Sequence, residues 1–260
     1  ALPGGCNPQG ARCGMVAAPG TAAAGGQRLT SNDRLFNPPM GGEPRSSGEE
    51  TRKRLEAAAA ELFAFSGFGE TSVRELTRRA GCNVAAVSYH FGSKEKLYEA
   101  VMLRVYRELA SRRVAAMEQI LAACAQPSLR AVLATFAQAF LGPFLFEEDG
   151  EIKLRLLVRE MMRPLLPPEL MQRELIAPAQ QALARALQVA VPQLAPERIP
   201  LVTYSFVAQL VQVIHLQLFT PARASLLASY GQALVDHIVA FTEAGILAVA
   251  GKPVLREEQP

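Results

Sequence analysis

Apolar residues recur every three or four positions over residues 50–110, the spacing that places one stripe on one face of a helix. The first stripe ends before a glycine and consists of Leu55, Ala58, Ala59, Leu62 and Phe63. Glycine readily adopts the left-handed conformation that ends many helices, so Gly67 is expected to end this one. Phe68 then lies where it can fold back onto the apolar face. The pattern predicts a helix that packs on one side.

Two shorter helices are predicted to follow. Ser72 and Glu75 have the S-x-x-E spacing of a capping box, which predicts a helix start, and Gly81 is the expected end. Asn83 is a suitable N-cap for a third helix over Val84–His90. Two helices joined by a short glycine-containing turn, the second short and with small side chains, are typical of a helix-turn-helix that enters the major groove of DNA.

The remainder of the chain shows helical periodicity without the alternation of a strand. The segments are predicted to be separated by Pro127, Pro143, Pro164, Pro167, Pro168, Pro192, Pro196, Pro200 and Pro221. Leu201–Phe219 is apolar almost all round, but glutamines and His215 interrupt it, which a membrane span seldom tolerates. We expect it to be a buried or interface helix paired with Ala222–Leu247. The predicted fold class is all-α.

The run FAFSGFGETSVRELTRRAGCNVAAVSYHFGSKEKL resembles the DNA-binding domain of TetR-type transcriptional regulators. The resemblance implies an N-terminal three-helix helix-turn-helix domain over 48–109 and a C-terminal helical ligand-binding and dimerisation bundle over 110–250, between tails at 1–47 and 251–260. The run LRLLVREMMRP and the later IAP are similar to the CecR branch of that family. The family's last two long helices form an intersubunit four-helix bundle, which implies a homodimer on a pseudopalindromic operator.

The resemblance also implies DNA contacts. Groove contacts are assigned to Val84, Ala85, Ala86 and Ser88, and phosphate contacts to Thr71, Ser72, Tyr89, His90 and Lys94. Ser72 also suits simple capping, Tyr89 suits packing, and His90 could cap its own helix. Ser88 stands where the family often has tyrosine, and Val84 where it often has a polar residue. This apolar face favours thymine-methyl contacts and DNA shape over bidentate hydrogen bonding.

A small-molecule effector is expected in the larger domain, and neither a cofactor nor a metal is implied. Candidate ligand-binding residues are Phe136, Phe140, Arg159, Met161, Met162, Tyr204 and His215. Apolar stripes of this kind are also typical of ordinary core. Arg155, Arg159 and Arg163 form a basic stripe, which is a solvated face paired with Glu151 and Glu160 in one interpretation. In the other, Arg159 or Glu160 anchors a ligand or couples the ligand helix to the DNA-binding domain. An enzyme and an adaptor without effector remain as alternatives.

Charge and cysteine content agree with a cytoplasmic DNA-binding protein. The net charge is +3, yet residues 45–113 alone carry thirteen Lys or Arg against nine Asp or Glu. The four cysteines lack zinc-site spacing and the density of a disulfide scaffold, so reduced thiols are expected. Cys82 is either a redox-sensing thiol or a small turn residue without a chemical role. Residues 1–47 have no continuous apolar stretch and are interpreted as a flexible tail, whose natural start could be Met15 or Met40.

Overall fold

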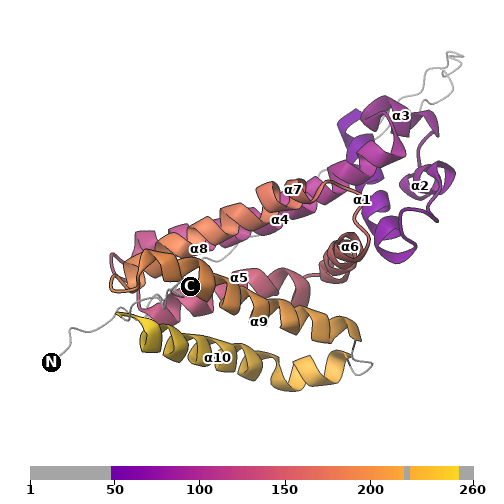
Figure 1. The fold of residues 1–260 in the computed structure, drawn as a ribbon. Coiled ribbons are helices and arrows are strands. Elements are labelled where there is room, and N and C mark those ends of the chain that lie inside the picture. Colours follow the sequence, from indigo (N-terminus) through magenta and orange to yellow (C-terminus); the bar gives the residue numbers. More distant parts are fainter. Residues whose placement is uncertain (1–47, 220–222, 252–260) are drawn as a thin grey trace, which may run out of the picture.

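The computed structural model describes residues 48–219 and 223–251, and side chains over 48–215 and 231–251; within these ranges its regular secondary structure is entirely helical (Figure 1). The predictions for the tails at 1–47 and 252–260 lie outside these ranges. The helices are α1 (Gly48–Phe65), α2 (Val73–Ala80), α3 (Ala85–Phe91), α4 (Lys94–Ala123), α5 (Leu129–Leu145), α6 (Gly150–Met162), α7 (Pro168–Met171), α8 (Ala177–Ala190), α9 (Ile199–Phe219) and α10 (Arg223–Val249). A π-helical turn, Gln172–Ile176, joins α7 to α8, and a 3₁₀ turn, Pro196–Arg198, precedes α9.

The helix boundaries predicted for the N-terminal domain are confirmed to within a residue or two. Gly67 has φ 91° and its amide donates to the Leu62 carbonyl, while Phe68 packs on Phe63 with ring centroids 5.7 Å apart. Gly81 is also left-handed, with φ 63°. At both turns a side chain would strain the backbone, which explains why glycine stands there.

Helix α4 crosses the predicted domain boundary. It runs for 30 residues without a break, from the end of the helix-turn-helix domain into the larger domain (Figure 1). Its start is capped as predicted, because the Ser93 hydroxyl accepts from the Lys96 amide at 3.2 Å. A division at residue 109 therefore falls inside one continuous helix, and α4 is a rigid connection between the two parts.

The larger domain packs α5 and α8 against α4, and α9 and α10 against α5. The stripe predicted over residues 129–140 is buried and includes Phe136 and Phe140. The expectation that Pro143 separates two helices is wrong, because this proline lies inside α5, where it is the third residue from the C-terminal end. A proline near a C-terminus forfeits only one late hydrogen bond, so the helix continues for two more residues.

Helices α9 and α10 lie side by side on the side of the larger domain away from α4 (Figure 1). Their predicted bounds are confirmed within two residues. By length and composition, the segment Gly231–Val249 of α10 could cross a membrane, and so could α5 and α6 taken together as a pair bent by 98°. The apolar helix singled out from the sequence was instead α9. Because α10 packs along α5 and α9, its apolar residues already have protein partners on one side.

Candidate nucleic-acid interface and effector region

Helix α3 presents the predicted groove-facing residues on its open side. Val87 is 1% exposed and anchors the helix against the core, whereas Val84 is half exposed and Ala85 and Ser88 are exposed. Ala86 is half-buried. The Asn83 side chain accepts from the Ala85 amide at 2.9 Å, so the predicted cap is confirmed although the helix starts one residue later. The resulting surface is small and largely apolar, as a helix that enters a groove closely requires.

The start of α2 separates two neighbouring hydroxyl groups that the sequence treats alike. Ser72 is exposed and its Oγ accepts from the Glu75 amide at 3.2 Å, which confirms the cap and leaves its O–H free to donate outward. Thr71 is 1% exposed, and its hydroxyl donates to the Gly67 carbonyl at 2.7 Å. This hydroxyl holds the turn before α2, and the predicted phosphate contact of Thr71 stays a prediction.

Lys94 combines a structural position with one remaining donor. Its ammonium group donates to the carbonyls of Phe68 and Thr71 at 2.9 and 3.0 Å, and lies 4.1 Å from the Phe68 ring centroid. These contacts attach the turn between α1 and α2 to the start of α4. A lysine ammonium has three N–H groups, so one is left for a phosphate. No local pattern around Lys94 indicated this bridging position.

Tyr89 and His90 lie together at the end of α3. Tyr89 is 84% exposed, so the alternative in which it packs in the core is wrong. Its ring meets the half-buried His90 ring edge-on at 4.8 Å. The phenol is therefore accessible from outside the fold. The DNA contacts of both residues stay predictions.

The structure does not bring the seven candidate ligand-binding residues together. Phe136 and Phe140 are buried on α5, and their rings pack together at 6.0 Å. The remaining side chains lie on α6 and α9, where Met161, Met162 and Tyr204 are 55%, 75% and 72% exposed and His215 is half-buried. Helical periodicity could not separate a buried stripe from an exposed one, so the set does not form one pocket.

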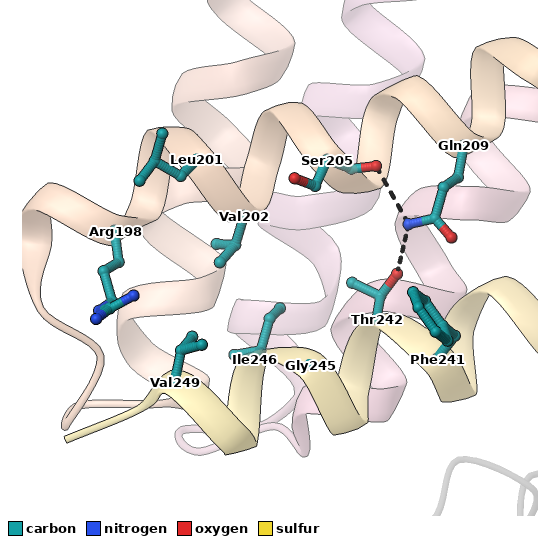
Figure 2. Close-up of a pocket in the computed structure, with 10 residues that line it drawn as sticks. All are labelled: Arg198, Leu201, Val202, Ser205, Gln209, Phe241, Thr242, Gly245, Ile246 and Val249. Carbon is teal, nitrogen blue, oxygen red and sulfur yellow. Dashed lines mark hydrogen bonds between the residues drawn. The ribbon is translucent and has the colours of Figure 1, made fainter. Parts of the chain in front are cut away.

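A groove does exist between α9 and α10, lined by residues that the sequence did not single out as ligand contacts (Figure 2). It has a volume of about 280 Å³ and is lined by Arg198, Leu201, Val202, Ser205, Gln209, Phe241, Thr242, Gly245, Ile246 and Val249. Within it the Gln209 amide donates to the Ser205 carbonyl and the Thr242 hydroxyl, both at 3.2 Å. Leu201 and Phe241 remain 58% and 65% exposed, so its rim is apolar.

Arg159 joins the larger domain to the first helix of the DNA-binding domain. Its Nε donates to the Ala64 carbonyl and a terminal nitrogen to the Phe65 carbonyl, both at 2.9 Å. These are C-terminal carbonyls of α1, the end where a cation is favourable. Of the two interpretations of the basic stripe, the inter-domain link is confirmed for Arg159. Arg155 instead pairs with Glu151, as the solvated-face interpretation expected.

Glu160 makes the same junction from the buried side. It is 3% exposed, and one oxygen accepts from the Tyr98 hydroxyl of α4 at 2.6 Å. The other oxygen accepts from the amides of Leu165 and Leu166 at 3.0 and 2.8 Å. Burial, and then the hydrogen bond to Glu160, raise the pKa of Tyr98 far above its usual range, so the phenol remains a donor. Arg159 and Glu160 therefore attach α6 to both α1 and α4.

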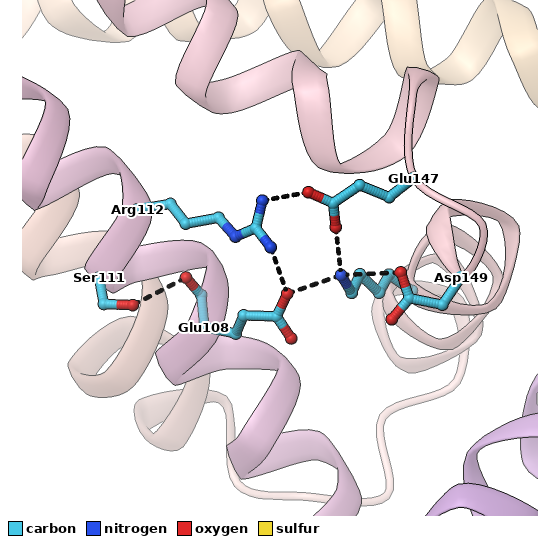
Figure 3. A network of polar contacts seen from close by, with 6 residues as sticks. Glu108, Ser111, Arg112, Glu147 and Asp149 are labelled. Carbon is cyan, nitrogen blue, oxygen red and sulfur yellow. Dashed lines mark hydrogen bonds and ion pairs between the residues drawn. The ribbon is translucent and has the colours of Figure 1, made fainter. Parts of the chain in front are cut away.

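A second polar cluster joins α4 to the start of α6 (Figure 3). The Lys153 ammonium, 3% exposed, lies 2.6 Å from Glu108, 2.8 Å from Glu147 and 2.9 Å from Asp149. Arg112 contacts the first two of these carboxylates. Burial alone would lower the pKa of Lys153, but the three carboxylates outweigh it and raise that pKa. The buried ammonium group of Lys153 is therefore paired with three carboxylates.

The described part of the chain includes Cys82, for which a redox role was considered, and the residue types that could bind a metal. Cys82 is a half-buried free thiol in the turn before α3, and burial raises its pKa, which favours the unreactive thiol over the thiolate. The plain turn residue is therefore the better interpretation. No group of three or more His, Cys, Asp or Glu suited to a metal occurs within residues 48–215 and 231–251.

Comparison with known proteins identifies the N-terminal domain. Residues 55–101 match the family model of bacterial regulatory proteins, tetR family. The chain is 31% identical over 151 residues to the HTH-type transcriptional dual regulator CecR of Shigella flexneri, covering 54% of this chain and 64% of that protein. It is 38% identical over 74 residues to the regulatory protein RaaS of Mycobacterium tuberculosis, covering 28% of this chain and 34% of that one. The chain thus matches less than two thirds of these relatives' length.

Solved structures agree on the fold. A transcriptional regulator from Rhodococcus aligns with a TM-score of 0.56 at 20% identity, covering 79% of this chain and 99% of that one. The TetR family regulator PfmR from Thermus thermophilus aligns with a TM-score of 0.53 at 22% identity, covering 79% and 97%. The shared fold is an N-terminal helix-turn-helix domain followed by a helical domain. The matching domain and the capped helix-turn-helix therefore identify residues 55–101 as a DNA-binding domain of the tetR family of bacterial regulatory proteins.

Proposed function

We propose that this protein is a homodimeric, ligand-responsive transcriptional repressor that binds a pseudopalindromic DNA operator in the cytoplasm. The observation that carries the proposal is helix α3, which is anchored by buried Val87 and presents Val84, Ala85 and Ser88 outward. Sequence is read by side chains that reach base edges in the major groove, and a helix with small residues approaches them closely. The family membership of the domain supports the same conclusion.

The contacts divide into base-facing and phosphate-facing groups. Val84, Ala85 and Ala86 supply methyl groups suited to thymine C5-methyl contacts, and the Ser88 hydroxyl supplies one polar contact. The Ser72 hydroxyl, the exposed Tyr89 phenol and the remaining Lys94 N–H are placed for phosphates. Base recognition then depends strongly on methyl groups and DNA shape, and affinity falls steeply with added salt.

The dimer is proposed to form through α9 and α10. Exposed apolar side chains on these two helices include Leu201 and Tyr204 of α9 and Phe241 and Leu247 of α10. An apolar surface on two adjacent antiparallel helices is suited to an intersubunit four-helix bundle. Two-fold symmetry would set the two α3 helices about 34–36 Å apart, on successive major grooves of one DNA face.

The ligand response is proposed to reach DNA through α6. Because Arg159 holds the end of α1 and Glu160 holds α4, a shift of α6 moves the DNA-binding domain with it. An effector that favours another α6 position would change the separation of the two α3 helices and lower operator affinity. The coupling thus requires differential binding to two arrangements of the same helices.

The test is retention of DNA from the protein's own promoter region in a gel-shift assay, across a salt series. Ser72→Ala and Lys94→Ala should weaken retention of all sequences, while Ser88→Ala should alter the preference among operator variants. Glu169→Gln, on an exposed residue of α7, is the matched control. Failure of the folded dimer to retain any promoter fragment at low salt would contradict the proposal.

A further inference from the structure

Most buried polar or charged side chains in the described part of the chain are paired. Those under 9% exposed are Thr71, Thr77, Arg113, Lys153, Glu160, Thr203 and Thr242. Five of the seven make hydrogen bonds or ion pairs within the described chain. Arg113 Nε and Thr203 Oγ1 are buried and have no hydrogen-bond partner among the described residues, and the same holds for the hydroxyl of Tyr106, which is 0% exposed. Since buried polar groups are normally satisfied, each exception requires a reason.

Among these exceptions Arg113 most needs an explanation, because its side chain carries a charge. It is 5% exposed on α4, and its guanidinium carbon lies 3.9 Å from the Phe140 ring centroid. None of the ion pairs among the described residues includes it, and residues 216–230 contain neither Asp nor Glu. Lys153, equally buried, has three carboxylates, and the adjacent Arg112 has two. The described residues therefore supply anions to the other buried cation but not to this one.

An unpaired buried guanidinium destabilises the fold. A cation over an aromatic face recovers only part of the lost hydration, and the Nε–H of Arg113 has no acceptor among the described residues. Burial lowers the pKa of Arg113 to about 9, so the side chain still carries its charge at pH 7. Groups that cost stability in the free protein are typical of binding sites, where a ligand supplies the missing partner.

The surroundings of Arg113 are aromatic and connect three helices. Phe140 packs on Phe136 of the same helix at 6.0 Å, and Phe136 packs on Phe206 of α9 at 6.1 Å. Thr203, whose hydroxyl is also buried without a partner among the described residues, lies one turn before Phe206. Apolar rings therefore connect Arg113 to α9, one of the helices proposed for dimerisation. A ligand held here needs an apolar body as well as an anionic group.

We propose that Arg113 binds the carboxylate of an amphipathic organic acid, whose apolar body packs against Phe140 and Phe136. The guanidinium fork matches the two oxygens of a carboxylate, which makes the contact bidentate and selective against uncharged analogues. This inference rests on the proposed ligand-responsive function, because it names the chemical class of its effector. Contact with the α5 rings, which pack on Phe206 of α9, places such an acid next to one of the two helices proposed to carry the dimer surface.

Thermal unfolding of the full chain tests the site with benzoate and octanoate, each against its uncharged amide. The variants are Arg113→Met, Arg113→Lys and, as the matched control, Arg112→Met on the neighbouring exposed arginine. Both acids should raise the Tm of the wild type and of Arg112→Met, and the amides should not. Arg113→Met should raise the ligand-free Tm by about 2–4 °C and abolish the acid response. Arg113→Lys should keep a charge yet lose roughly tenfold in acid affinity.

Three results would overturn the inference. A lower ligand-free Tm in Arg113→Met would show that the arginine has a structural role. Equal acid responses in the wild type and in Arg113→Met, or no response of the wild type to either acid, would show that Arg113 does not bind these acids. Gel shifts with the same samples separate this from the proposed function. Arg113-dependent acid binding without a change in DNA retention would leave the acid site standing and contradict ligand-responsive regulation. Absence of DNA retention would contradict the repressor proposal while the thermal result still decides the acid site.

Discussion

The DNA-binding domain and the larger helical domain place their exposed apolar residues in different ways. Val84 and Tyr89 lie within six residues on and beside one short helix. Leu201 and Phe241 lie forty residues apart in the sequence, and the contact between α9 and α10 brings them to one surface. The first surface follows from local structure, and the second from tertiary contacts. A sequence motif therefore locates a surface only when the residues of that surface are close together in the sequence.

The largest expected effect breaks a long-range contact. Glu160→Ala removes the acceptor for a phenol and two backbone amides in a buried site. Unfolding free energy should fall by about 2–4 kcal/mol, because charged hydrogen bonds are lost and buried donors are left unpaired. Chemical denaturation measures it, with the exposed Glu151→Ala as control at roughly 0.5 kcal/mol or less. Equal losses in the two variants would remove the distinction between buried junction and surface pair.

The next effect tests the local surface. Val87→Ala removes two buried methyl groups under α3 and should cost about 1–3 kcal/mol of stability. Val84→Ala, on the half-exposed side of the same helix start, should leave stability within about 0.5 kcal/mol and alter operator binding instead. Denaturation and gel shift on both variants separate the two roles. A stability loss in Val84→Ala equal to that in Val87→Ala would show that α3 is not divided into a buried and an open face.

A smaller effect sharpens the connection between the two domains. Arg159→Ala frees two C-terminal carbonyls of α1 and should lower stability by about 1–2 kcal/mol. Its stronger consequence should be a weakened dependence of DNA binding on effector, since α6 would no longer hold α1. Arg163→Ala, exposed four residues further on, is the control. An unchanged effector response in Arg159→Ala would place the coupling elsewhere.

The smallest expected effect is on the acid dependence of stability. The hydrogen bond from Lys153, the largest cause, holds the pKa of Glu147 below its ordinary value. A depressed carboxyl pKa contributes stability that is present above the ordinary pKa near 4.3 and is lost as pH falls through the lower folded value. Replacing Lys153 with Met should therefore flatten the fall of Tm with acid below about pH 4.3. Parallel curves for variant and wild type would contradict the assignment.

Local rules predicted much of the first domain. The caps at Ser72, Asn83 and Ser93 and the left-handed glycines follow from chemistry within three or four residues. The same rules failed where a partner came from far along the chain. Thr71 and Ser72 are neighbours of similar chemistry, yet one hydroxyl is buried against the preceding turn and the other is exposed. Sequence spacing does not distinguish them.

The effector region shows the limit more clearly. Met161 and Met162 resembled pocket residues but are exposed, while Arg113 was not singled out and proves to be a buried cation. An arginine in a run of charges on a long helix has no local feature that distinguishes burial from exposure. Only the position of α5, which sets Phe140 over it, makes the difference.

The sequence by itself determined the helices, their caps and the similarity of residues 55–101 to the tetR family, because these depend on side chains a few positions apart. The tertiary structure alone decided which polar groups are buried and which of them find partners. It attached α6 to the DNA-binding domain through Arg159 and Glu160, supplied three carboxylates to Lys153, and supplied no carboxylate of the described residues to Arg113. The physical reason is that pairing and burial depend on packing between distant helices, whose geometry is absent from any local pattern.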